Sequence, residues 1–266
     1  MVVTGAGAGI GRALARGLAA AGARVVVNDL VFEAATAVAQ EIGGYPHPGD
    51  VGTEKGVREL VAGAREYLGE IDIYCSNAGI AIGAGPDAPD AAWQQSWEVN
   101  LMAHVRASRE LLPAWLARGR GCFVVTASAA GLLTMLGTAT YSVTKHAAES
   151  YAEWLAATYA HRGLAVHCIC PQGVRTNMLA QSGEAGKVVL QDAAIEPEQV
   201  AEALLAGLAA GTFLILPHPE VRGYYALRAS DTDRWLRGMN RMQQRIEAVQ
   251  QELGEAPAAG NAGSIA

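Results

Sequence analysis

Tyr141 and Lys145 are the residues whose types and spacing most clearly suggest chemistry, and they stand four positions apart in the run YSVTK. On a helix this spacing puts both side chains on one face. A free tyrosine has a pKa of about 10 and is a poor base at neutral pH, but a neighbouring ammonium group favours the phenolate. The pair could therefore take up or release a proton, although an ordinary pair on a helix surface has the same spacing.

Ser128 favours the catalytic interpretation of this pair. It ends the apolar run VVTAS, which resembles a buried strand, and it lies 13 positions before Tyr141. In an open parallel sheet, ligands bind beyond the carboxyl ends of the strands, so Ser128 is expected to face a site there. Its hydroxyl could hold a substrate oxygen while Tyr141 exchanges the proton.

A glycine-rich turn near the start of the chain could bind phosphate groups. The run VVTGAGAGIG joins a strand-like segment to a helix-like segment, and Gly5, Gly9 and Gly11 have the spacing G-x-x-x-G-x-G. Gly5 permits a sharp turn, whereas Gly9 and Gly11 leave room for a pyrophosphate at the N-terminus of the helix. A plain tight turn is the alternative, but the strand before and the helix after it favour dinucleotide binding.

Asp29 indicates which dinucleotide is bound. It closes the second strand-like segment, 18 residues after Gly11, where a carboxylate can accept hydrogen bonds from ribose hydroxyls and repel a 2′-phosphate. No Arg or Lys directly follows Asp29, and Ala8 in the turn is neutral, so NAD is favoured over NADP. The alternative is that Asp29 caps the following helix. With NAD bound, the positive nicotinamide ring would join Lys145 in favouring the phenolate of Tyr141.

Strands and helices alternate along the chain and must position these residues. Six short apolar runs are expected to be strands, namely 2–4, 24–28, 71–76, 122–128, 165–170 and 213–216. Six longer segments rich in Ala, Leu, Glu and Arg are expected to be helices, namely 10–21, 32–42, 53–68, 91–118, 140–161 and 197–209. This alternation predicts an α/β fold of three layers, a doubly wound Rossmann fold with a mostly or wholly parallel sheet and an extra C-terminal helix.

Two regions fall outside the alternation. The connection 177–195 contains two glycines and is expected to act as a mobile lid. A helix is expected from residue 231, with an apolar seam at helical spacing that packs on the body of the protein or on another subunit; the seam comprises Trp235, Met239, Met242, Ile246, Val249 and Leu253. We therefore expect one catalytic domain over 1–230, an amphipathic helix over 231–254 and a disordered tail over 255–266.

Composition and charge exclude several classes of protein. The 266 residues are 51% hydrophobic and only 17% charged, which excludes disorder along the whole chain. The net charge of −6 argues against a nucleic-acid partner, and no apolar run reaches the roughly 18 residues of a membrane span. The opening MVVTG is not a secretory leader, and the His and Cys residues lack ligand spacing, so we expect a cytoplasmic protein without a metal. Cys168 and Cys170 are expected to point to opposite faces of their strand.

The motifs, in their order, resemble those of the short-chain dehydrogenase/reductase family, in its compact single-domain subgroup. The resemblance covers about 2–219 and rests on TGxxxGxG at 4–11, the Asp50-Val51 pair after a third strand, NAG at 77–79, Asn100 in WEVNL, Ser128, and YxxxK at 141–145. It implies a seven-stranded sheet and an NAD(H)-dependent oxidoreductase that interconverts a secondary alcohol and a ketone by hydride transfer. The run PQGVRT departs from the usual PGxVxT of the family, because Gln172 replaces a glycine.

The resemblance also implies roles for individual residues. Tyr141 would be the acid/base, Ser128 would polarise the carbonyl, and Asn100 would hold a water in a proton relay with Lys145. The alternative for Asn100 is a structural role at a helix kink. The cofactor-binding residues would be Thr4, Gly5, Gly9, Ile10, Gly11, Asp29, Leu30, Asp50, Val51, Asn77, Ala78, Gly79, Tyr141, Lys145, Pro171, Val174 and Thr176.

The substrate is expected to be a moderately apolar alcohol or ketone. Its candidate wall residues are apolar, and each could equally belong to the core: Ile80, Ile82, Leu132, Leu133, Met135, Leu136, Met178 and Leu179. The resemblance implies a homotetramer or homodimer formed through the helices at 91–118 and 140–161. A non-catalytic NAD(H)-sensing protein on the same fold is the alternative, and the presence of Ser128, Tyr141 and Lys145 together favours an enzyme.

Overall fold

The computed structural model describes residues 1–83, 85–182, 190 and 193–252. Its centre is a seven-stranded sheet in the order β3-β2-β1-β4-β5-β6-β7, and every neighbouring pair of strands is parallel. The predicted doubly wound parallel sheet is therefore confirmed. The strands are β1 Val2–Val3, β2 Val26–Asp29, β3 Tyr45–Pro48, β4 Ile73–Ser76, β5 Gly121–Thr126, β6 Leu164–Ile169 and β7 Leu214–Ile215.

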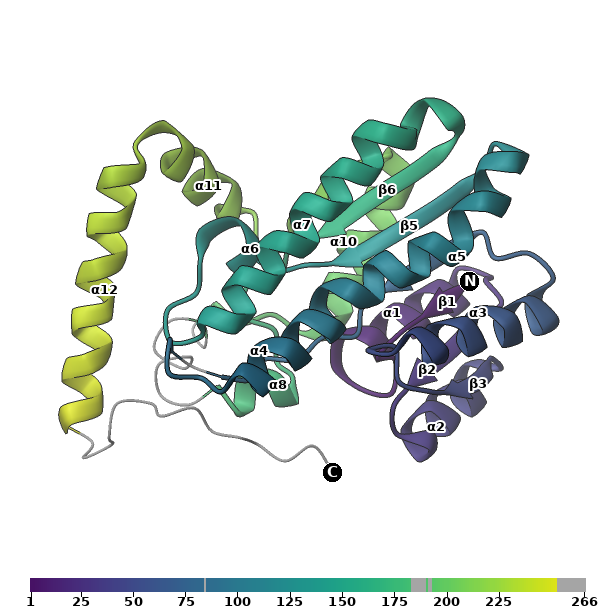
Figure 1. Ribbon diagram of the computed structural model, residues 1–266, viewed down its shortest axis with the longest axis horizontal. Coiled ribbons are helices and arrows are strands. Elements are labelled where there is room, and N and C mark those ends of the chain that lie inside the picture. The colour runs from purple at the N-terminus through teal and green to yellow at the C-terminus, as the bar shows by residue number, and fades with distance from the viewer. Residues whose placement is uncertain (84, 183–189, 191–192, 253–266) are drawn as a thin grey trace.

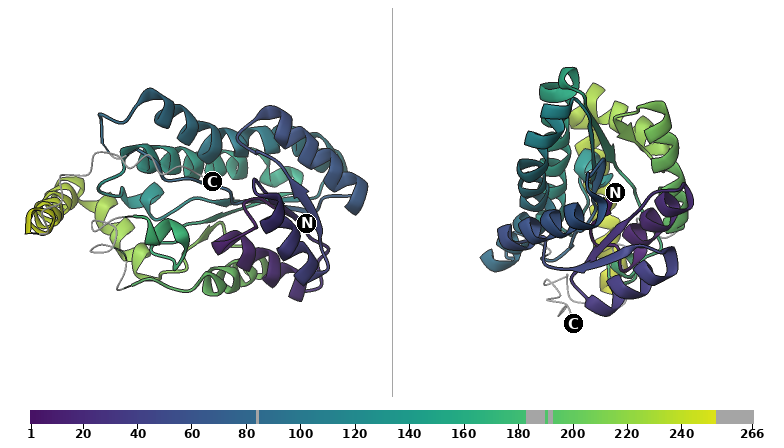
Figure 2. Two further views of the ribbon diagram at one scale, coloured as in Figure 1. Left: turned by 90° about the horizontal axis from the view of Figure 1, so that it is seen from below. Right: turned by 90° about the vertical axis from the view of Figure 1, so that its right-hand side faces the viewer.

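Helices cover both faces of this sheet, as Figures 1 and 2 show. One face is covered by α1 Gly9–Ala20, α2 Phe32–Ile42 and α10 Pro197–Ala210, and the other by α3 Glu54–Leu68, α5 Ala103–Arg118 and α7 Ala139–Tyr159. Successive residues of a strand point to opposite faces, so each central strand contributes to both cores. Val124 packs under the first group of helices, whereas Phe123 and Val125 pack under the second.

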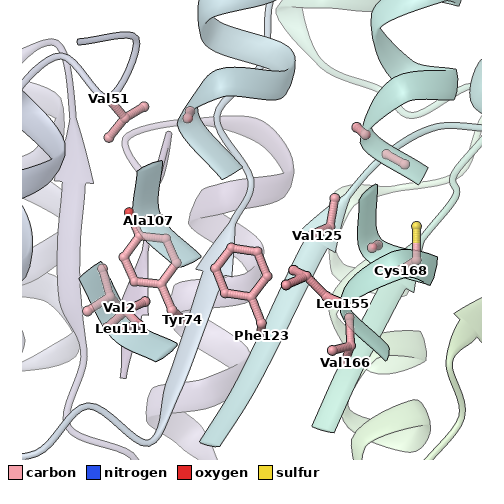
Figure 3. Packing of buried hydrophobic residues seen from close by; sticks show 14 of the residues in the cluster. Val2, Val51, Tyr74, Ala107, Leu111, Phe123, Val125, Leu155, Val166 and Cys168 are labelled. Carbon is pink, nitrogen blue, oxygen red and sulfur yellow. The ribbon is translucent and has the colours of Figure 1, made fainter. Parts of the chain in front are cut away.

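Aromatic side chains fill the centre of the core between the sheet and α3, α5 and α7 (Figure 3). The ring of Phe123 stacks on that of Tyr74 from the neighbouring strand, with the centroids 5.8 Å apart. The ring of Trp115 from α5 meets the Phe123 ring in an edge-on arrangement, with the centroids 6.2 Å apart. The indole nitrogen of Trp115 donates to the carbonyl of Ile71, so its polar atom is also satisfied inside the core.

The strand that the apolar runs do not reveal is β3, whose sequence is YPHP. Proline lacks a donor and is confined to sheet edges, and β3 is indeed an edge strand that pairs only with β2. The ring of Tyr45 stacks on Tyr67 of α3 at 4.8 Å. This strand therefore owes its position to edge pairing and one aromatic contact rather than to an apolar run.

Several elements differ from the expected segments. The single helix expected over 91–118 is divided into α4 Asp90–Trp97, a π-helical segment η1 Glu98–Met102, and α5. Short helices α6 Ala130–Leu133 and α8 Asn177–Ala180 lie in segments expected to be loops. The predicted end of the fourth strand run is also too late, since β5 ends at Thr126 and leaves Ser128 two residues beyond it.

The chain leaves the sheet through α11 Glu220–Ser230 and α12 Thr232–Glu252, which form an arm at one end of the molecule (Figure 1). Ile246 of the predicted seam is buried, and Trp235, Met239 and Val249 are half-buried, whereas Met242 is exposed. The ring of Trp235 lies 6.5 Å from that of Tyr224 in α11 and packs against the core cluster. The seam therefore turns in part toward the protein's own body, and its contact with another subunit stays a prediction.

Several predicted features fall outside the described residues. They are Leu253 of the seam, the tail 255–266, and 183–189 and 191–192 of the predicted lid. Within the described ranges, none of the helices is both long and apolar enough to cross a membrane.

Replacement of Phe123 with Ala should lower the free energy of unfolding by about 3–5 kcal/mol. Phe123 is fully buried, and its removal would leave a cavity between the rings of Tyr74 and Trp115. Denaturant titration followed by circular dichroism measures the change. Phe32→Ala is the matched control, because Phe32 is 54% exposed and its loss should change stability by less than about 0.5 kcal/mol. Equal losses in the two variants would contradict this account of the core.

Candidate active site

The carboxyl ends of the strands open into one long cleft. It is lined from the glycine-rich turn, from the ends of β2, β4, β5 and β6, and from the start of α7. The strand order reverses between β1 and β4, which is where a doubly wound sheet binds its ligand. Of the residues expected at the site, all line this cleft except Thr4 and Asn100, which are buried behind it.

The glycine-rich turn packs directly on the NAG segment. The hydroxyl oxygen of Thr4 accepts hydrogen bonds from the backbone of Asn77 at 2.9 Å and of Ala78 at 3.0 Å. Gly5 has a φ of +60°, and a Cβ there would lie 2.9 Å from the Cα of Ala78. A Cβ on Gly11 would lie 2.0 Å from the carbonyl oxygen of Gly5. The turn is therefore a rigid frame that only glycine permits at these two positions.

The N-terminus of α1 offers free donors to the cleft. Its N-cap is Ala8, which supplies no side-chain hydrogen bond, and no acidic residue occupies the first turn. The first backbone N–H groups of a helix have no partner within it, and they carry a partial positive charge. A Cβ on Gly9 would lie 3.0 Å from the methyl group of Thr176, so Gly9 keeps this approach open. These features fit a pyrophosphate.

The carboxylate of Asp29 is held in place by the backbone on both sides. One oxygen accepts a hydrogen bond from the N–H of Gly7 at 2.9 Å and the other from the N–H of Val31 at 3.0 Å. Val31 is the N-cap of α2, so the helix-capping alternative also describes a real contact. Each oxygen keeps a further lone pair directed at the cleft or solvent, and the group can therefore still accept from a ribose.

Asp50 and Val51 line the cleft beyond β3. A carboxylate oxygen of Asp50 accepts from the N–H of Gly52 at 2.8 Å, while Val51 is buried. This places a polar and an apolar side chain together at one end of the cleft, as expected for the surroundings of an adenine ring. The assignment of that ring stays a prediction.

Tyr141 and Ser128 meet across the cleft from α7 and the loop after β5. The Ser128 hydroxyl lies near the phenol, donates to the carbonyl oxygen of Pro171 at 3.4 Å, and accepts from the N–H of Ala130 at 3.1 Å. Burial raises the pKa of Tyr141, and the nearby Ser128 hydroxyl opposes that rise. The phenol alone is therefore held in its protonated form, and it needs a nearby positive charge to become a base.

Lys145 supplies such a charge from inside the protein. Its side chain is 2% exposed, and its ammonium nitrogen lies 5.6 Å from the centre of the Tyr141 ring. The ammonium donates to the carbonyl oxygen of Thr126 at 2.8 Å. Burial lowers the pKa of Lys145 to about 8, so the group remains mostly charged at neutral pH. A Cβ on Gly79 would lie 3.1 Å from this nitrogen, which explains why glycine follows Ala78.

Asn100 lies in the π-helical segment η1, and its side chain is engaged by protein groups. Its amide nitrogen donates to the carbonyl of Ile80 at 2.9 Å and to the hydroxyl of Thr144 at 3.0 Å, and its oxygen accepts from the N–H of Ile80 at 2.8 Å. These bonds tie the loop after β4 to the helix that carries Tyr141. They support the structural alternative for Asn100, and the water-holding role stays a prediction. π-Helical segments are frequent at functional sites.

His218 is a positioning residue that sequence reasoning set aside. Its Nδ1 accepts a hydrogen bond from the N–H of Gln172 at 3.1 Å, and its Nε2 lies 3.2 Å from the carbonyl oxygen of Ala193. The buried imidazole thus connects Gln172, which stands where the family motif has a glycine, to the end of the connection 177–195. Only its position after a short strand, HP at 218–219, could have marked it in the sequence.

Most expected wall residues line the cleft, with one exception. Leu132 is buried in the core, and its carbonyl accepts a hydrogen bond from Arg228 of α11. The others were correctly placed: Ile80, Ile82, Leu133, Met135, Leu136, Met178 and Leu179. The sequence did not indicate that the arm also contributes, with Tyr224, Leu227, Trp235, Met239, Met242 and Ile246. The last four belong to a seam that periodicity revealed, but periodicity does not show which surface a seam faces.

The expectation that Cys168 and Cys170 point to opposite faces is wrong. Their sulfur atoms lie 3.8 Å apart in the same core, because residues two apart on a strand share a face. In the part of the chain that the structure describes, no three His, Cys, Asp or Glu residues are grouped as metal ligands would be.

Comparison with known proteins places these features in a family. A family model described as short chain dehydrogenase matches residues 1–187. The 1-deoxy-11-beta-hydroxypentalenate dehydrogenase of Streptomyces exfoliatus is 32% identical over 243 residues, which cover 88% of this chain and 87% of that protein. The cyclohexanol dehydrogenase of Acinetobacter sp. (strain SE19) is 32% identical over 210 residues, which cover 76% and 84%.

A solved structure agrees with the sequence comparisons. A 7 alpha-hydroxysteroid dehydrogenase complexed with NADH and 7-oxo glycochenodeoxycholic acid matches with a TM-score of 0.71 and 27% identity, covering 81% of this chain and 91% of that one. The named relatives are all dehydrogenases of hydroxyl-bearing compounds. Since the family model spans well over half of the chain, and relatives more than 30% identical align along most of its length, this protein belongs to the short-chain dehydrogenase family.

Proposed function

We propose that the protein is an NAD(H)-dependent dehydrogenase that interconverts a secondary alcohol and a ketone, with Tyr141 as the acid/base. The observation that carries this proposal is the grouping of Tyr141, Ser128 and Lys145 in the cleft, where Ser128 and Lys145 are buried and Tyr141 is half-buried. The same cleft continues to the uncapped N-terminus of α1. A nicotinamide cofactor, when bound, accepts or supplies the hydride.

The residues of the chain divide the proton chemistry among them. The Ser128 hydroxyl orients the substrate oxygen beside the phenol. Tyr141 gives its proton to that oxygen when a ketone is reduced and takes it back when an alcohol is oxidised. Lys145 stabilises the phenolate by its charge, and burial of the site strengthens that interaction because little water is present to screen it. Asn100 and Thr144 keep the helix that carries Tyr141 in register with the loop after β4.

The carboxylate of Asp29 supports NAD rather than NADP. Its position is fixed by two backbone N–H groups at the end of β2, where the adenosine ribose of a dinucleotide would lie. A phosphate on the 2′-oxygen would bring negative charge against this carboxylate. The cofactor that we propose is therefore NAD.

The apolar lining supports an alicyclic substrate of moderate size. Leu133, Met135 and Leu136 follow Ser128 along the chain and line the cleft between it and Tyr141. The relatives are named for a hydroxypentalenate and for cyclohexanol, both of which contain rings. We extend this chemistry to the present chain as part of the proposal.

Assembly and location complete the proposal. Val143 and Trp154 of α7 are exposed apolar side chains on a helix that the family resemblance assigns to subunit contacts, and they support a homodimer or homotetramer. The four cysteines are free, which fits a reducing compartment such as the cytoplasm.

Tyr141→Phe should lower kcat by about 10²- to 10⁴-fold, the usual contribution of a positioned acid/base group. The phenyl ring keeps the packing, so binding of NADH, measured by fluorescence, should not change. A spectrophotometric assay with a panel of secondary alcohols and NAD measures the turnover. Tyr159→Phe, on the same helix but outside the cleft, is the control and should retain full activity. A fully active Tyr141→Phe enzyme would refute the assigned role.

Asp29→Asn should reduce the preference for NAD over NADP by about 10- to 100-fold, as expected for the removal of roughly 1.4–2.7 kcal/mol of charge repulsion. The ratio of kcat/KM for the two cofactors measures this preference. Glu33→Gln removes a neighbouring negative charge from the first turn of α2, outside the cleft, and should leave the ratio unchanged. If both variants keep the wild-type ratio, Asp29 does not face the ribose.

Lys145→Met should abolish turnover and yet stabilise the fold at neutral pH. Burial lowers the pKa of Lys145 from 10.5 to about 8, so between these pH values the unfolded chain binds more protons and the stability of the wild type rises with pH. Below pH 8 the cost of the buried charge is fully present, at about 3 kcal/mol. The lost hydrogen bond to Thr126 offsets about 1 kcal/mol of it.

The variant should therefore exceed the wild type by about 2 kcal/mol at pH 7, and this advantage should be lost as the pH rises from 8 toward 10.5. Urea titrations between pH 7 and pH 10 measure it. Lys55→Met is the control, since that side chain is 84% exposed and should show no such pH dependence. A difference that stays constant with pH would contradict the buried charge.

A further inference from the structure

The arm formed by α11 and α12 is anchored beside the catalytic helix. The guanidinium of Arg228 in α11 donates to the carbonyl of Leu132 and lies 3.3 Å from Nε2 of His146. His146 follows Lys145 directly, and its Nδ1 lies 2.8 Å from the carbonyl oxygen of Ser142. The arm is thus held to the segment that positions Tyr141. Residues of α12 line the cleft, and the helix itself stands at one end of the molecule (Figure 1).

The inner side of α12 adds an apolar wall to the cleft. Trp235, Met239 and Ile246 line it from the arm, and Met135 and Leu136 line it from the loop before α7. The elements next to these residues, α6 and α12, lie at the end of the molecule away from α1 and β2, beside which the glycine-rich turn and Asp29 stand (Figure 1). We therefore assign the space between the arm and the loop before α7 to the substrate rather than to the dinucleotide.

Two arginines of α12 line the same cleft with a glycine between them. Arg234, Gly238 and Arg241 are spaced by four and three positions and therefore share one face of the helix. A Cβ on Gly238 would meet only Nη2 of Arg241, at 3.8 Å, so packing does not require a glycine there. Glycine is a poor residue inside a helix. Its presence leaves a notch, without a side chain, on the helix surface between Arg234 and Arg241.

The charge at this notch differs from that of the protein as a whole. The chain has a net charge of −6, which repels anions, yet the stretch from Arg234 to Arg245 contains four arginines and no acidic residue. Asp231 and Asp233 precede this stretch, and the carboxylate of Asp231 accepts a hydrogen bond from the N–H of Arg234 at 2.9 Å as a cap of the helix. Among the described residues, neither Arg234 nor Arg241 forms an ion pair. The acidic residue that α12 brings to the cleft is Glu247, six positions beyond Arg241 and off their shared face.

We propose that the substrate is an amphipathic carboxylate, and that Arg234 and Arg241 bind its anionic group. The apolar body of this alcohol or ketone lies between Met135 and the seam of α12, and its carboxylate lies at the end remote from the reacting carbon. A guanidinium binds a carboxylate through two parallel hydrogen bonds, which a neutral ester cannot reproduce. This inference rests on the proposed dehydrogenase function and adds the class of its substrate.

Alicyclic secondary alcohols of one to four rings, each as the free acid and as the methyl ester, test the proposal. With NAD, the best substrate should be an acid, and its kcat/KM should exceed that of its ester at least tenfold, mainly through a lower KM. In R234Q/R241Q this ratio should fall at least tenfold, and in R234K/R241K it should fall less, because charge remains without the two-point geometry. R237Q, on α12 but outside the cleft lining, should keep the wild-type ratio. An ester preferred by the wild type, or a ratio unchanged in R234Q/R241Q, would overturn the proposal.

Calorimetry separates this inference from the proposed function. The acids are titrated into Tyr141→Phe protein in the presence of NADH, with and without the R234Q/R241Q changes. Binding that the two arginine changes abolish supports the anion site even if no panel member is turned over, a result that would count against the dehydrogenase function alone. If none of the acids binds, the anion site is refuted. Circular dichroism of R234Q/R241Q checks that α12 remains helical.

Discussion

A single buried ammonium group is the interaction on which the site depends. Lys145 keeps its charge although it lies among apolar strands, and its compensation within the described residues is a hydrogen bond to the carbonyl of Thr126. Burial disfavours this charge, as the lowered pKa shows. The same burial makes the charge effective on the phenol of Tyr141, because an exposed ammonium at 5.6 Å would be screened by water. The buried charge thus costs stability, and in the proposed mechanism it supplies reactivity.

The rest of the fold can be understood as the support that this charge requires. Thr126 ends the central strand β5, whose two neighbours hold it by parallel pairing along its length. Gly79 leaves room for the ammonium, and Asn100 joins the loop beside it to the catalytic helix. Each support comes from the carboxyl end of a strand or from a helix packed against the sheet. A position error of an ångström at any of them would weaken the interaction between Lys145 and Tyr141.

The residues of the site were predictable because each obeys a local rule. A strand, a tight turn and a helix are enough to predict a phosphate site at Gly5 and Gly11, and four positions on a helix are enough to bring Tyr141 and Lys145 together. The parallel sheet follows in the same way from apolar segments that alternate with helical ones. These rules depend on near neighbours in the chain; the structure confirms the sheet and places these residues along one cleft, and their roles stay predictions.

The features that escaped prediction depend on contacts between distant parts of the chain. The strand β3 contains two prolines and forms only because the edge of β2 accepts it. The engagement of Asn100 with Ile80 and Thr144 joins three segments that the sequence separates widely. The helical spacing of the apolar residues revealed the seam of α12, but this spacing does not show whether the seam packs on the body of the protein or on another subunit. Only the packing of α11 beside α7 turns this seam toward the cleft.

The arm separates the proposed recognition of the substrate from the cluster around Tyr141. The cluster around Tyr141 needs exact geometry and therefore rests on the sheet, whereas the recognition of a substrate body tolerates more variation. α12 joins the body through α11 and the ring of Trp235, so its residues can change with little effect on the core. Cations on this helix, rather than beside Lys145, also leave the charge of Lys145 unchanged. A second ammonium or guanidinium near Lys145 would lower its pKa further and discharge the group that we propose as the activator of Tyr141.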